Sequence, residues 1–176
     1  MNGLYALPFH GNRAVEGWQI SGVVSASTGP PFTILDGIDA TGFGSNLSRP
    51  NVNPGFTNNP VLGTPTKWFN PAAFSMAPIG TLGNIGRDTV RGPHFNNTDI
   101  ALLKDTKLTE RVRVQFRAEF FNILNHTNYR VPLNTVGTIL YTGLANGKPI
   151  PNPNAGRITN IVGTPRQIQF ALKFLF

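Results

Sequence analysis

Residues 165–176, Pro-Arg-Gln-Ile-Gln-Phe-Ala-Leu-Lys-Phe-Leu-Phe, decide the fold class of this chain. Apolar side chains recur at every second position from Ile168 to Phe176, and mostly polar ones, Gln169 and Lys173 among them, fill the positions between. Because side chains alternate between the two faces of a β-strand, the segment predicts a strand with one entirely apolar face. Its other face is polar enough for water, so the strand suits a barrel wall between lipid and a wet lumen.

Residues 111–121 repeat this pattern. Five apolar side chains alternate with four ionic groups and a glutamine: Val112, Val114, Phe116, Ala118 and Phe120 against Arg111, Arg113, Gln115, Arg117 and Glu119. Ionic groups on one face of a strand need water or each other. With Thr109 and Glu110 the run reaches about 13 residues, more than the usual 5 or 6 of a soluble strand and enough to cross a membrane at a tilt. We interpret it as a transmembrane barrel strand; the alternative is an amphipathic strand of a soluble sheet.

The composition favours β-structure with many turns. The chain has 19 Gly, 15 Pro and 13 Phe in 176 residues, and only 13% of its residues are charged. Glycine and proline disfavour long helices, and no apolar run reaches the length of a membrane helix. The first residues also lack the basic start and apolar stretch of a signal peptide. We therefore expect the chain to be the C-terminal part of a longer barrel protein.

The net charge of +7 raises nucleic acid as a partner, but its distribution argues against one. The basic residues are scattered from Arg13 to Lys173, and in the dense stretch 104–117 they alternate with apolar residues. No nucleic-acid-binding motif accompanies them, so we expect no nucleic-acid partner. The absence of cysteine excludes disulfides and thiolate metal sites.

Five strands and two long connections make up the expected fold. The strands are expected at residues 3–9, 15–27, 95–104, 109–122 and 166–176. The connections alternate between short turns and long loops at residues 28–94 and 123–165, as in outer-membrane barrels with short periplasmic turns and long extracellular loops. The sequence thus predicts an all-β fold: antiparallel strands of a partial transmembrane barrel with two long extracellular loops. A soluble domain would instead need further strands inside the loops, for example at Phe32–Leu35 or Thr138–Tyr141.

The residues provide no candidate active site. His10, His94 and His126 stand far apart in turn-like contexts without metal-binding spacing, so we expect no catalytic residue, metal or cofactor. Trp68, Phe69 and Phe74 in the first loop are candidate ligand contacts, as in sugar stacking. Aromatic residues in long loops more often anchor the loop, and we favour that interpretation.

Six motifs follow one another along the chain: Gly17-Trp-Gln-Ile-Ser-Gly22, Thr28-Gly-Pro-Pro-Phe-Thr33, Trp68-Phe-Asn-Pro-Ala-Ala-Phe74, Gly83-Asn-Ile-Gly-Arg-Asp-Thr-Val-Arg-Gly-Pro93, Phe116-Arg-Ala-Glu-Phe-Phe-Asn-Ile-Leu-Asn-His126 and Pro165-Arg-Gln-Ile-Gln-Phe170. In this order they resemble the C-terminal barrel portion of Oar-like TonB-dependent transporters, a group that often begins with a carboxypeptidase-regulatory-like domain.

The resemblance implies a bacterial outer-membrane barrel of about 22 strands with an N-terminal plug and a TonB box, both missing from this chain. It also implies that the closing aromatic residues Phe170, Phe174 and Phe176 are recognised by the barrel assembly machinery. The expected partners are outer-membrane lipid, that machinery, an unknown small or oligomeric substrate, and the TonB complex only through the missing N-terminal part. The alternative function is a soluble β-sandwich carbohydrate-binding module.

Overall fold

A computed structural model describes residues 1–44, 48–132 and 137–176, and these contain strands, turns and one short 3-10 helix but no α-helix. They form two compact units. The first, here called the sheet unit, comprises Met1–Ser27, Phe95–Asn128 and Gly163–Phe176. The second, the loop unit, comprises Thr28–His94 and Tyr129–Val162. None of the described residues forms a helix of the length and apolarity needed to cross a bilayer.

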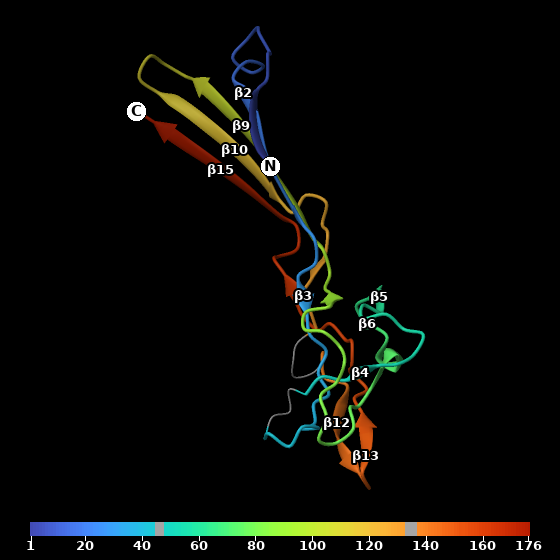
Figure 1. Cartoon of the computed structure of the whole chain (residues 1–176). Coiled ribbons are helices and arrows are strands. Elements are labelled where there is room, and N and C mark those ends of the chain that lie inside the picture. The colour runs from blue at the N-terminus through green and yellow to red at the C-terminus, as the bar shows by residue number, and fades with distance from the viewer. Residues whose placement is uncertain (45–47, 133–136) are drawn as a thin grey trace. The chain divides into compact units, whose positions relative to one another are not determined.

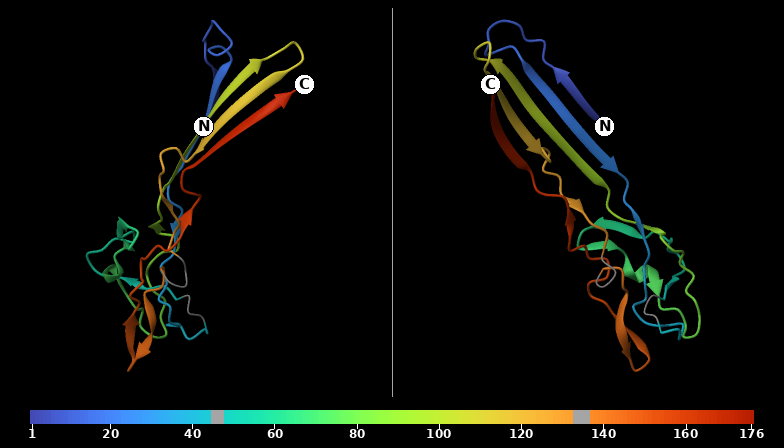
Figure 2. Two further views of the ribbon diagram at one scale, coloured as in Figure 1. Left: turned by 180° about the vertical axis from the view of Figure 1, so that it is seen from behind. Right: turned by 90° about the vertical axis from the view of Figure 1, so that its left-hand side faces the viewer.

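The sheet unit is one five-stranded antiparallel sheet, as the sequence predicts (Figure 1). Its strands lie side by side in chain order, each paired with the next (Figure 2). They are β1 (Asn2–Ala6), β2 (Trp18–Ser27), β9 (Phe95–Lys107), β10 (Arg113–Phe121) and β15 (Gln167–Leu175). Segments 28–94 and 123–165 are therefore insertions between neighbouring strands.

Four strand ends differ from the expected ones by three residues or more. Two of them are starts, since β2 begins at Trp18 rather than at residue 15 and β10 at Arg113 rather than at residue 109. Strand β1 ends at Ala6 rather than at residue 9, because Pro8 has no N–H to donate and the Phe9 N–H turns back to the Leu7 carbonyl at 2.8 Å. Strand β9 extends beyond the expected residue 104 to Lys107, which pairs with Arg113. A tight turn follows, closed by backbone hydrogen bonds from residues 108 and 109 to the Val112 carbonyl.

The register brings the apolar positions of neighbouring strands onto one face. Ile20 of β2 stands opposite Leu102 of β9, which stands opposite Ala118 of β10, and Ala118 stands opposite Phe170 of β15. Every residue of β15 is exposed, and the hydrophobic core cluster of the chain lies wholly in the loop unit. The sheet is thus a single layer whose apolar face has no protein cover within its own unit.

The loop unit is built around a small aromatic and aliphatic core. Phe69 lies at its centre, with ring centroids 6.2 Å from Phe32 and 6.1 Å from Phe74. Short strands and one 3-10 helix surround the core: β3 (Pro31–Phe32) with β8 (Val90–Arg91), β4 (Asn51–Val52) with β7 (Phe74–Ser75), β5 (Val61–Thr64) with β6 (Lys67–Phe69), β12 (Tyr141–Ala145) with β13 (Lys148–Pro151), and η1 (Pro71–Ala73). A further ladder pairs β11 (Asn128–Tyr129) with β14 (Ile161–Val162).

The two long insertions form one folded unit rather than separate irregular loops. A parallel bridge joins Leu35 of the first insertion to Ile139 of the second, and the Tyr141 N–H donates to the Asp36 carbonyl at 3.0 Å. The strands inside the insertions are ladders of two to five residues. These ladders do not supply the second large sheet that a sandwich needs.

Candidate functional site: the two faces and the edges of the sheet

The apolar face of the sheet is large and exposed. Phe170 is 67% exposed although its ring stacks on Phe116, with centroids 6.2 Å apart and planes at 16°. The face carries, from β1 to β15, Tyr5, Ile20, Val24, Ile100, Leu102, Val114, Phe116, Ala118, Phe120, Ile168, Phe170, Leu172 and Phe174. Soluble monomers rarely expose so large a contiguous apolar surface, so this face requires an apolar environment.

The length of the strands matches a bilayer. Strand β10 has 9 residues, and at about 3.3 Å per residue and a tilt of about 40° it rises about 23 Å along the bilayer normal. Outer-membrane barrels carry an apolar band of about 25 Å. The apolar face therefore has the height of a membrane-spanning wall.

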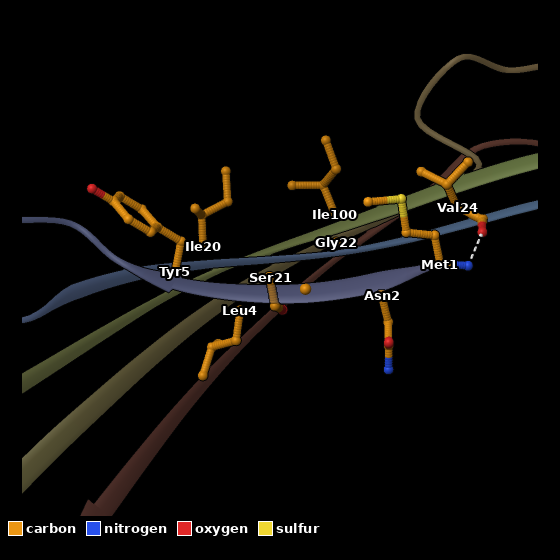
Figure 3. Close-up of a pocket in the computed structure, with 10 residues that line it drawn as sticks. Met1, Asn2, Leu4, Tyr5, Ile20, Ser21, Gly22, Val24 and Ile100 are labelled. Atoms are coloured by element: carbon orange, nitrogen blue, oxygen red, sulfur yellow. Dashed lines mark hydrogen bonds between the residues drawn. The ribbon is translucent and has the colours of Figure 1, made fainter.

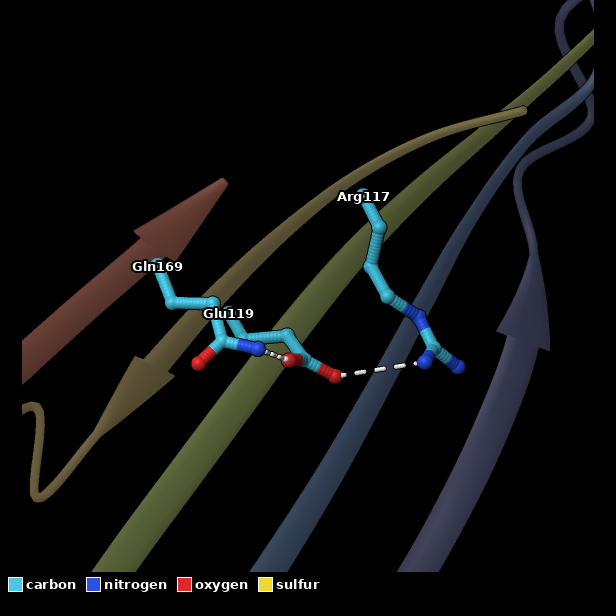
Figure 4. Close-up of polar contacts among 3 residues, drawn as sticks. All are labelled: Arg117, Glu119 and Gln169. Atoms are coloured by element: carbon cyan, nitrogen blue, oxygen red, sulfur yellow. Dashed lines mark hydrogen bonds and ion pairs between the residues drawn. The ribbon is translucent and has the colours of Figure 1, made fainter. Parts of the chain in front are cut away.

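The opposite face carries a hydrogen-bonded polar network. The Arg117 guanidinium lies 3.5 Å from the Glu119 carboxylate, which also accepts a hydrogen bond of 3.0 Å from the Gln169 amide (Figure 4). Nearer the short turns, the Gln115 amide donates to the Asp105 carboxylate at 3.2 Å. These contacts join β9 to β10 and β10 to β15, so the polar side chains satisfy one another and leave further groups for water.

Lys104 is a charged residue on the apolar face. Its side chain is only 8% exposed, and its Nζ donates to the Arg13 carbonyl at 2.9 Å and also to the Glu16 carbonyl. The ammonium group lies 5.6 Å from the centre of the Trp18 ring, a cation–π distance. The lysine thus ties β9 to the turn between β1 and β2, and its ammonium group is held by two backbone carbonyls and the Trp18 ring.

The two edge strands of the sheet are open. Strands β1 and β15 each have one partner within the sheet, so each leaves a row of backbone groups available for pairing. The predicted assembly-signal residues lie on and beyond the β15 edge: Phe170 and Phe174 point to the apolar face, and Phe176 follows the strand and is 96% exposed. All three rings are therefore accessible to a partner.

The loop aromatics are core residues, which corrects the ligand-contact expectation for two of them. Phe69 is fully buried and Phe74 is 4% exposed, so neither ring can stack on a ligand. Trp68 is half-buried against the same core, and its indole N–H donates to the Arg91 carbonyl at 2.7 Å. These contacts agree with the anchoring interpretation.

Asn122, which the sequence reasoning missed, fixes the end of β10. It has a left-handed backbone, with φ of 47°, and a buried side chain. Its amide donates to the carbonyls of His126 at 3.0 Å and Thr164 at 3.1 Å, and its oxygen accepts the His126 N–H at 2.9 Å. Asparagine adopts the left-handed conformation more readily than most other non-glycine residues. An asparagine directly after the alternating pattern of residues 111–121 was therefore a signal in the sequence for the end of this strand.

Asp36, also missed, is a buried acid at the junction of the two insertions. Its side chain is fully buried, and neither carboxylate oxygen has a hydrogen-bond partner among the described residues. Burial raises the pKa of Asp36 to about 7, and the nearby Ala77 N–H opposes the shift only in part. Burial and the charge of Asp36 likewise raise the pKa of Tyr141. Within the described residues, no group of three or more His, Cys, Asp or Glu could hold a metal ion.

A comparison with protein-family models identifies one match for the chain. The model described as outer membrane beta barrel domain matches residues 1–169, which include the loop unit and the first four strands of the sheet. No curated protein and no solved structure matches the chain.

Proposed function

The chain belongs to the outer membrane beta barrel domain family and is a protein of the bacterial outer membrane, and from this we propose that it forms barrel wall and extracellular loops of an Oar-like TonB-dependent transporter. The observation that carries the proposal is the two-faced sheet, with an uncovered apolar face and a networked polar face. In this role the apolar face meets outer-membrane lipid, and the polar face lines the lumen through which substrate passes.

Open edges support a place within a larger barrel. A membrane offers no water to unpaired backbone groups, so a β-sheet is stable there only as a closed barrel, of at least about eight strands. Five strands leave the edges of β1 and β15 to pair with further strands. We propose that the barrel assembly machinery recognises the β15 edge through Phe170, Phe174 and Phe176.

The loop unit supports a role in substrate capture. Its aromatic core and the β-bridge between the two insertions fold segments 28–94 and 123–165 into one unit with a surface of its own. We propose that this surface helps to bind a small or oligomeric substrate, such as an oligosaccharide or a peptide. The chain would perform no chemistry and hold no cofactor, and energy would come from the TonB complex through an N-terminal part outside this sequence.

Paired single-cysteine variants test which face meets lipid. The chain has no cysteine, so each introduced thiol is unique in it. Phe170→Cys lies on the apolar face, and the neighbouring Gln169→Cys lies on the polar face of the same strand. We expect a fluorophore at position 170, in the purified protein reconstituted in vesicles with brominated acyl chains, to be quenched, and one at position 169 to be spared.

Equal quenching at the two positions would refute the assignment of the faces. Cell fractionation with an antibody to residues 167–176 gives an independent test of the transporter role. We expect an outer-membrane band several times larger than 19.1 kDa. A soluble band of 19.1 kDa would instead favour the carbohydrate-binding alternative, although the burial of Phe69 and Phe74 removes the stacking surface on which it depended.

A further inference from the structure

An apolar groove crosses the sheet between β1, β2 and β9 (Figure 3). It has a volume of about 350 Å³. Tyr5 and Ile20 stand on one side of it, Met1 and Val24 on the other, and Ile100 rises from β9 (Figure 3). These side chains all stand on the apolar face of the sheet, so the groove is open on that face.

Two glycines form the floor of the groove. Gly3 of β1 pairs with Gly22 of β2, and Gly22 pairs with Ile100 of β9. A side chain at either glycine would point into the groove, since both share the face of Ile100. The missing side chains therefore create the depression.

Neither the backbone nor the packing requires glycine at these two positions. Neither residue has a positive φ, and β1 and β2 pair with their neighbours without a bulge. A Cβ added to Gly3 would meet no atom within 4 Å, and one added to Gly22 would meet only the Asp99 carbonyl oxygen, at an ordinary 3.7 Å. Glycine weakens a strand, and in a regular strand it often marks the close approach of a ligand or another backbone.

We propose that this groove is a binding site for one acyl chain of a bilayer lipid. The family places the sheet in a membrane, the walls of the groove are apolar, and the groove lies on the face that we assign to lipid. Lipid tails are as apolar as the groove, so a seated chain is held by van der Waals packing and not by transfer out of water. A chain packed between the Tyr5–Ile20 and Met1–Val24 walls exchanges more slowly than lipid elsewhere. The inference rests on the proposed function only in that the apolar face meets lipid.

Filling the groove from its floor tests the proposal. Gly22→Leu places a side chain in the groove, whereas the control Ala26→Leu places the same side chain on the same face of β2 outside it. The protein is purified from outer membranes in mild detergent, and lipid retained per protein is measured by native mass spectrometry. We expect wild type and Ala26→Leu to retain one intact diacyl lipid, and Gly22→Leu to retain at least tenfold less.

Three results would overturn the proposal: equal lipid retention in wild type and Gly22→Leu, retention of detergent or free fatty acid alone, or a wild-type dimer that Gly22→Leu dissociates. The last would make the groove a contact between copies. If Gly22→Leu does not accumulate in the outer membrane, Gly3→Leu fills the groove from β1. The quenching experiment at Phe170→Cys separates the two hypotheses. If the fluorophore at position 170 is not quenched, the proposed function fails. If it is quenched but Gly22→Leu retains as much lipid as wild type, only the groove site is refuted.

Discussion

Replacing Asp36 by asparagine should make the loop unit more stable at neutral pH and remove its dependence on pH. The carboxyl group is fully buried, and no partner among the described residues compensates its charge. Its pKa is about 7 in the folded chain, against 3.8 for an ordinary aspartate side chain. Between these values the unfolded chain loses the proton that the folded chain keeps, so the free energy of unfolding falls as pH rises.

The size of this effect follows from the two pKa values. A difference of about three pH units corresponds to about 4 kcal/mol, and about 3 kcal/mol of the fall lies between pH 4.5 and 8. Above pH about 7 the curve becomes flat. Asparagine cannot ionise, but its buried amide leaves donors unpaired, which costs about 2 kcal/mol. We therefore expect Asp36→Asn to be about 2 kcal/mol more stable than wild type at pH 8 and no more stable at pH 4.5.

Amide hydrogen exchange of the detergent-purified protein measures this directly. The Leu35 N–H donates to the Thr138 carbonyl and the Tyr141 N–H to the Asp36 carbonyl, each at 3.0 Å, so both amides report opening at the junction of the insertions. After correction for the intrinsic exchange rate at each pH, wild-type protection should fall from pH 4.5 to 7. Protection in Asp36→Asn should stay constant.

Asp39→Asn is the matched control for the same measurement. Desolvation is the largest single effect on Asp39 and raises its pKa, but hydrogen bonds from the Thr41 hydroxyl and from the N–H groups of Gly44, Gly42 and Thr41 together outweigh it and lower the pKa. The stabilising effect of Asp39 is present above the pKa that Asp39 has in the unfolded chain and is lost on acidification. Asp39→Asn should therefore keep the wild-type fall in amide protection between pH 4.5 and 7. Equal wild-type protection at pH 4.5 and 8 would refute the reasoning about Asp36.

Three further substitutions test the two faces of the sheet, the turn between β1 and β2, and the core of the loop unit. Phe170→Arg should cost about 2–4 kcal/mol because it places a charge on the lipid face, whereas Gln169→Arg on the polar face should be tolerated; outer-membrane accumulation on immunoblots distinguishes the two, and equal loss would contradict the assignment of the faces. Lys104→Met should free the carbonyls of Arg13 and Glu16 and speed proteolysis in the turn between β1 and β2, with no change in the loop unit; unchanged cleavage would contradict the tie. Phe69→Ala should destabilise the loop unit by about 3–5 kcal/mol, read as faster exchange of the Leu35 amide, while β10 amides keep their protection.

The strands were predictable where the period of two was strong. In β10 and β15 nearly every position agrees with one face, so both the existence of the strands and their faces follow from the residues alone. Strand β9 was a weaker prediction, because Leu103 lies on the polar face while Lys104 and Thr106 lie on the apolar one. Its end was misplaced for the same reason, since pairing with β10 and not its own pattern extends it to Lys107.

The loop unit was not predictable, because its core has no period. Single apolar residues far apart in the sequence, such as Phe32, Phe69, Ile85 and Leu140, converge on it. Phe32, Phe69 and Ile85 stand among Pro, Gly and Asn, which indicate turns and hide the packing. The burial of Asp36 depends on contacts between the two insertions, which no local pattern contains.

The ladder at the base of the first insertion has a consequence for the order of folding. An insertion as long as residues 28–94 costs about 2.5 kcal/mol more to close than a four-residue turn, by the entropy of loop closure. Strands β3 and β8 hold its two ends together: the Gly92 N–H donates to the Pro30 carbonyl at 2.9 Å, and a Cβ on Gly29 would lie 1.7 Å from the Gly92 oxygen. Once this stem has formed, β2 and β9 meet across an effectively short connection, so the kinetic barrier to their pairing becomes that of a hairpin.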